Sequence, residues 1–162
     1  MENILEKLYD NFYNKLDDDY SRGETIELLL NESRATQIAV IFGDLNYQVG
    51  NGGWLQYIGN EYFRYDYDLF NELIRELLEK ENTYALQGLA GIIEEVEEYD
   101  DALSTVEEKL EGWGECDEDL CYEFLRKALE TGIDKLSEDY FKISNRVLEE
   151  LETILNNMEQ EA

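Results

Sequence analysis

The chain is 162 residues long and carries 40 acidic and 13 basic residues, a formal net charge of −27, with no histidine and no proline. Such a field repels nucleic acid and anionic membranes and attracts basic surfaces. This charge argues against direct binding of nucleic acid, nucleotides or phosphorylated substrates. Because 43% of the residues are hydrophobic and 12% aromatic, we expect one folded domain over 1–162 rather than a disordered acidic tail.

Helical periodicity runs through nearly all of the chain and predicts an all-α fold of six to eight helices. The first helix is predicted over 1–18, and a capping box from Ser21 to Glu24 predicts the start of the second. A third is predicted over 33–49, where apolar residues share one face. A small hairpin near 57–66 stays open as an alternative, since helix signals are weak there. Later helices are predicted over 66–80, 83–99, 102–111, 117–131 (ending at Gly132) and 138–158.

A glycine-rich stretch interrupts the pattern after residue 49. It is not a phosphate-binding P-loop, which needs a lysine, because no lysine lies between Lys15 and Lys80. We expect Gly50 to end the preceding helix and the next three residues to form a turn through positive φ. We also expect the turn to bury aromatic residues and to have its loose backbone groups hydrogen-bonded by nearby amide side chains. A binding role is the alternative. The residues concerned are Asn51, Gly52, Gly53, Trp54, Gln56, Tyr57 and Asn60.

Neither a metal site nor a catalytic centre is expected. In an EF-hand register, the loop beginning at Asp18 places Tyr20, Arg22 and Leu29 at ligand positions. Cys116 and Cys121, with no histidine in the chain, do not supply the four soft ligands of a zinc site, so we expect reduced thiols and no cofactor. A pair of catalytic carboxylates stays open, but periodicity places most acids on exposed faces, so we expect no enzyme.

No membrane segment is expected either. No apolar run reaches about 18 residues. The N-terminal segment 1–12 is acidic and amphipathic, unlike a secretory signal. We therefore expect a cytoplasmic protein.

The segment 94–123 has the highest density of acids, fourteen against the single base Lys109. Acids four residues apart on a helix are about 6 Å apart along its axis. Phosphates along one DNA strand advance about 3.4 Å along the duplex axis, and winding roughly doubles the gap through space. Rows of carboxylates thus imitate a row of phosphates. The candidate partner-binding residues are Glu94, Glu95, Glu97, Glu98, Asp100, Asp101, Glu107, Glu108, Glu111, Glu115, Asp117, Glu118 and Asp119, with Glu123 completing the fourteen.

The stretch from Asn51 to Asn60 resembles the N-G-G-aromatic-x-Q-aromatic motif of a family of small bacterial and phage proteins. Its named members include DNA-mimic proteins. The similarity extends over roughly 33–160, and Leu136 and Tyr140 resemble a leucine-x-x-x-tyrosine pattern in the closing helix of that family. The resemblance implies an all-helical fold, mimicry by surface carboxylates and no catalytic residues. It also implies that the motif is a fold-defining turn.

Together these features predict a DNA mimic that occupies the basic DNA-binding surface of another protein. The partner classes are a transcription regulator, a nucleoid protein, a restriction enzyme or a CRISPR effector, the last two implying a phage-encoded counter-defence protein. The alternative is an acidic chaperone or immunity protein that binds a basic client or toxin. A homodimer is a further possibility, because duplex DNA presents two strands and the apolar stripe of the last helix suits either a core or a dimer seam.

Overall fold

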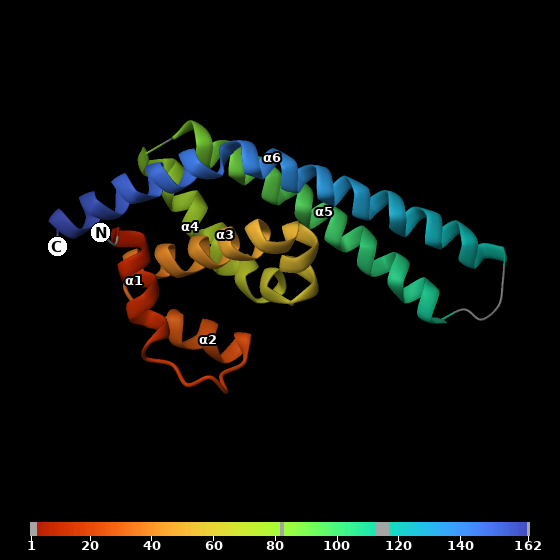
Figure 1. The fold of residues 1–162 in the computed structure, drawn as a ribbon, viewed down its shortest axis with the longest axis horizontal. Coiled ribbons are helices and arrows are strands. Elements are labelled where there is room, and N and C mark those ends of the chain that lie inside the picture. The colour runs from red at the N-terminus through yellow and green to blue at the C-terminus, as the bar shows by residue number, and fades with distance from the viewer. Residues whose placement is uncertain (1–2, 82, 113–116, 162) are drawn as a thin grey trace.

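The computed structural model describes the backbone of residues 3–81, 83–112 and 117–161, and the side chains of 3–80, 83–108 and 123–160. Six helices make up this part of the chain, which confirms the all-α prediction (Figure 1). No strand occurs among the described residues, so the hairpin considered near 57–66 is not formed. The helices are α1 (Ile4–Tyr13), α2 (Arg22–Leu29), α3 (Arg34–Gly59), α4 (Tyr62–Glu81), α5 (Tyr84–Gly112) and α6 (Asp117–Glu161).

Short polar side chains start the first three helices. Asn3, Ser21 and Ser33 each accept a hydrogen bond from the backbone N–H three residues further on. These bonds satisfy N–H groups that have no partner within the helix. The predicted start of α2 at Ser21 is therefore confirmed. The Glu24 carboxylate accepts from the Ser21 hydroxyl at 3.1 Å, whereas a capping box has it accept from the backbone N–H.

The first half of α3 is the centre of the fold. Residues 36–42 are all buried, and α1, α4 and α6 pack against this helix. A helix segment that is buried on every side needs neighbours around its whole circumference. Most of the hydrophobic core therefore forms around α3.

The helices α5 and α6 form a long antiparallel pair that extends beyond the bundle of α1–α4 (Figure 1). Both are continuous, so the predicted breaks near 100 and 132 are wrong. Gly132 is not a helix end, because α6 runs through it. A Cβ there would lie 2.6 Å from Tyr99 Cζ. The glycine instead permits close packing of the two helices. The predicted break at 132–137 is also occupied by Ile133 and Leu136, which are buried and favour an unbroken helix.

Two carboxylates of α6 cap other helices. Glu152 Oε1 accepts a hydrogen bond from the Ile4 N–H at 2.7 Å, and Glu150 accepts from the N–H groups of Ala85 and Leu86. A negative charge at these positions also interacts favourably with the helix dipoles. On its apolar face, α6 buries Val147, Leu151 and Ile154 in the core of the same chain. These three residues of the stripe are therefore part of the core.

Candidate functional site

The glycine-rich motif forms a sharp bend inside α3. The helix continues through Gly50 and Asn51, so the predicted helix end at Gly50 is wrong. The break falls at Gly52 (φ −147°) and Gly53 (φ +74°, ψ −176°), the latter a conformation that glycine adopts readily. A Cβ on Gly53 would also lie 2.8 Å from Ser137 Oγ of α6. Both the backbone angle and this approach require glycine.

The bend directs two aromatic residues into the core. Trp54 is fully buried, and its backbone N–H donates to Ser137 Oγ at 2.9 Å while its indole N–H donates to the Leu136 carbonyl at 3.3 Å. The buried Tyr57 hydroxyl donates to Asp66 Oδ2 of α4 at 2.6 Å. These contacts connect the second half of α3 to α4 and α6. The motif thus holds helices together and leaves its aromatic side chains unavailable to a ligand.

The amides of the motif have a different role from the one predicted. We expected Gln56 and Asn60 to bond loose backbone groups at the turn. Both amide nitrogens instead donate to Gln48 Oε1 at 3.0 Å, across the bend. Gln48 is buried on the first half of α3. One acceptor therefore holds both halves of the kinked helix, which residue spacing alone does not reveal.

Replacing Gly53 with alanine is expected to destabilise the fold by about 1–3 kcal/mol, because alanine is strained at this backbone conformation. The same change at Gly50, which is helical and has no atom within 4 Å of its would-be Cβ, should stabilise by roughly 0.5–1 kcal/mol. Urea unfolding of both variants measures the two effects. Equal effects at the two positions would contradict the assignment of the bend to Gly53.

The acids of α5 divide into two rows. Four that recur at helical spacing, Glu94, Glu98, Asp101 and Glu108, are exposed on one face and are named here the α5 stripe. No lysine or arginine occurs between Lys80 and Lys109, so nothing on this helix before residue 109 compensates the charge. Like charges four residues apart destabilise a helix by a few tenths of a kcal/mol. The α5 stripe is thus a row that carries only negative charge, and its pair Glu94 and Glu98 is retained at some cost in helix stability.

The second row faces a cleft between α5, α4 and the end of α3. Glu97, Asp100 and Glu107 line it, together with Arg64 and Tyr67, around a volume of about 530 Å³. Glu97 accepts a hydrogen bond from the Tyr67 hydroxyl. Burial and the neighbouring carboxylates raise the pKa of Asp100. Glu97 and Asp100 are thus engaged within the fold, whereas Glu107 is exposed, and Asp101 of the α5 stripe lies at the edge of the same cleft.

The remaining predicted acids lie apart from both rows or outside the described side chains. Glu95 is exposed on α5, to one side of the α5 stripe. On α6, Glu123 is exposed and pairs with Arg126 at 2.8 Å. The side chains of Glu111, Asp117, Glu118, Asp119 and Cys121, and the whole of Glu115 and Cys116, lie outside the described residues. Apart from Glu123, the candidate partner-binding residues whose side chains are described therefore all lie on α5.

A buried ionic cluster was not predicted from the sequence. Arg22 of α2 contacts Asp44 of α3 at 2.7 Å and Asp66 of α4 at 2.9 Å, and the side chains of all three are less than 9% exposed. Tyr13 of α1 accepts from Arg22 and donates to Asp44. Desolvation, opposed by Arg22 and by the hydrogen bond from Tyr57, raises the pKa of Asp66 to about 6. The cluster joins four helices, and its carboxylates are occupied by protein groups.

No family model, curated protein or solved structure matches this chain. Within the described residues, no group of three or more acids or cysteines is placed to hold a metal ion. None of the helices in that part of the chain has an apolar stretch long enough to cross a membrane.

Proposed function

We propose that this protein is a DNA mimic, which binds the DNA-contacting surface of a basic protein and excludes DNA from it. The partner is a DNA-binding protein, such as a transcription regulator, a restriction enzyme or a CRISPR effector. The α5 stripe is the surface that stands in for phosphates. No catalytic step is part of the proposal.

The observation that carries the proposal is the α5 stripe itself. It is exposed, straight and free of lysine and arginine, and it lies on a helix pair that extends from the bundle (Figure 1). Neighbouring members of the row are three, four and seven residues apart, or about 4.5, 6 and 10 Å along the axis. A basic groove that follows a phosphate backbone meets charges at comparable intervals. An extended arm also gives access to such a groove.

The mixed charge of α6 supports α5 as the helix that meets the partner. The described part of α6 contains Arg126, Lys127, Lys135, Lys142 and Arg146 among its acids. Arg126 and Lys142 lie within 4 Å of acids of their own helix. A partner's lysines and arginines therefore meet only acids along the α5 stripe and charges of both signs on α6. The nearest cations to the stripe belong to other helices, with Arg75 of α4 beside Glu94 and Lys135 of α6 beside Glu98.

Binding to the partner is expected to weaken at least tenfold between roughly 0.05 and 0.2 M salt, since contacts between exposed charges are screened over a Debye length of about 8 Å at physiological ionic strength. Surface plasmon resonance on a partner captured by the immobilised protein measures this. An affinity that does not change with salt would contradict recognition through the α5 stripe. A salt-sensitive partner that does not bind DNA would instead indicate the alternative of a chaperone or immunity protein.

Neutralising the α5 stripe should leave the fold intact. The variant carrying Glu94→Gln, Glu98→Gln, Asp101→Asn and Glu108→Gln is expected to hold or gain thermal stability, because like-charge repulsion along the helix is relieved. Glu97 is left unchanged because it bonds Tyr67. Thermal unfolding followed by circular dichroism tests this. A large loss of stability would show that these acids stabilise the fold and would remove the basis for assigning them to a partner.

A further inference from the structure

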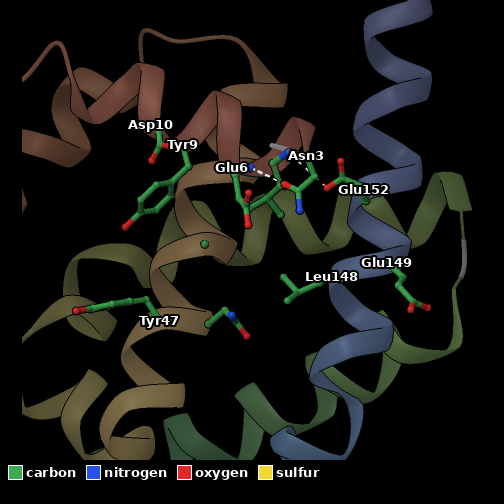
Figure 2. Close-up of a pocket in the computed structure, with 11 residues that line it drawn as sticks. Asn3, Glu6, Tyr9, Asp10, Tyr47, Leu148, Glu149 and Glu152 are labelled. Carbon is green, nitrogen blue, oxygen red and sulfur yellow. Dashed lines mark hydrogen bonds between the residues drawn. The ribbon is translucent and has the colours of Figure 1, made fainter. Parts of the chain in front are cut away.

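A second cavity, lined by no residue of α5, lies between α1, α3 and α6 (Figure 2). Its volume is about 530 Å³. It is close to the N-terminal end of α1, whereas the second half of α5 extends away from this end of the molecule (Figure 1). The two surfaces are therefore separate.

The walls of this cavity combine apolar, aromatic and acidic groups. Leu148 of α6 and Glu6 of α1 point into the space, and Tyr47 of α3 lies at its edge (Figure 2). Leu148 is partly buried and packs against the core, while Tyr47 is 64% exposed. An exposed tyrosine beside an apolar wall gives a ligand both a ring face and an apolar surface to contact.

The floor of the cavity depends on Gly43. A Cβ at this position would lie 2.6 Å from Tyr9 Cδ2, so the missing side chain lets the Tyr9 ring lie against α3. The Tyr9 hydroxyl donates to Asp44 Oδ1 at 2.6 Å, which fixes the ring. The cavity therefore has one ordered aromatic wall and one exposed aromatic edge.

All charges that line the cavity are negative. The described lining includes Glu6, Asp10, Glu149 and Glu152 and contains no lysine or arginine. Glu152 is already occupied by the N–H groups at the start of α1. Glu6 and Asp10 are exposed, on adjacent turns of one face of α1. This distribution excludes an anionic ligand and favours a cation.

We propose that this cavity binds an alkylguanidinium group, the chemistry of an arginine side chain. The alkyl part lies against Leu148, and the planar cation lies between the tyrosines and the carboxylates of α1. Guanidinium is favoured over ammonium because it stacks on aromatic rings and bonds carboxylates through two N–H groups. The proposal does not depend on DNA mimicry, and its test needs no protein partner.

Titration with Nα-acetyl-arginine N-methylamide, followed by the NMR signals of Tyr47 and Leu148, tests the site. We expect saturable shifts, and at least fivefold weaker binding for the variant with Glu6→Gln and Asp10→Asn. The matched control, Glu94→Gln with Glu98→Gln, removes the same charge from α5 and should bind within twofold of the unmodified protein. Both variants change exposed residues, and their thermal unfolding verifies that they fold.

Three results would overturn the proposal: no saturable shift, equal weakening by both variants, or equal binding of the uncharged isostere Nα-acetyl-citrulline N-methylamide. Equal weakening would mean that the probe responds only to net charge. A comparison of agmatine, a free alkylguanidinium, with the blocked arginine shows whether the guanidinium group comes from a small molecule or from a polypeptide. Tighter binding of agmatine supports the site with a small-molecule ligand, and tighter binding of the blocked arginine supports it with a polypeptide ligand.

Discussion

Replacing Arg22 with methionine is expected to lower the free energy of unfolding by about 3–5 kcal/mol, the cost of leaving buried charges without a partner. Asp44 and Asp66 would then face each other inside the fold with no counter-charge. The variant also loses the guanidinium stacked 4.3 Å from the Tyr62 ring centroid. Urea unfolding at pH 7.5 measures the loss, and the matched control is Arg75→Met on the exposed face of α4.

The loss of unfolding free energy caused by Arg22→Met should be smaller at lower pH. Burial already raises the pKa of Asp66 to about 6 with the arginine present, and removal of the arginine raises it further. The folded-state pKa of Asp66 lies above its unfolded-state pKa, so ionisation of Asp66 destabilises the fold at pH values above the folded-state pKa. This destabilisation disappears as the pH falls and the carboxyl is protonated. A variant that also carries Asp44→Asn and Asp66→Asn should recover part of the stability at pH 7.5. A loss below roughly 1 kcal/mol for Arg22→Met would contradict this account of the cluster.

Replacing Trp54 with alanine is the second change with a large expected effect. It should lower the free energy of unfolding by about 3–5 kcal/mol, because the indole is fully buried. The ring packs edge-on against Tyr57 and Tyr140, with centroids 5.8 and 5.9 Å away. The variant also leaves the Leu136 carbonyl without its indole donor. The control is Tyr84→Ala, since Tyr84 is 79% exposed and should change stability by less than about 0.5 kcal/mol. If Trp54→Ala kept its stability but lost the partner, the motif would be a binding site.

Periodicity predicts most of the helices because each buries one apolar face. It fails where glycine has two physical roles. In the sequence, Gly132 and Gly53 both look like interruptions of a helix. In the structure, Gly132 permits close packing of two helices, whereas Gly53 takes a positive φ. The difference depends on Tyr99 and Ser137, which are distant in sequence from Gly132 and Gly53. Local pattern therefore identifies the helical segments, but it does not show which of them join into one continuous helix.

The candidate site was predictable in part. The exposed acids of α5 follow from the apolar face at Val96 and Leu103, which fixes the opposite face as solvent-exposed. That Glu97 bonds Tyr67 depends on packing between α4 and α5, which one sequence does not give. The ionic cluster was missed for a similar reason, since Arg22 lies 44 residues from Asp66. An isolated arginine in an acidic chain was the only local signal.

The most direct test of DNA mimicry is competition with a DNA duplex for the captured partner. The unmodified protein should displace the duplex. The variant neutralised along the α5 stripe should need at least tenfold more protein, since a tenfold loss corresponds to about 1.4 kcal/mol over four contacts. The control carries four equivalent neutralisations at exposed acids elsewhere, Asp18→Asn, Asp19→Asn, Glu27→Gln and Glu79→Gln. This control is expected to displace the duplex as well as the unmodified protein does. Equal potency of all three proteins would contradict the assignment of the α5 stripe as a phosphate mimic.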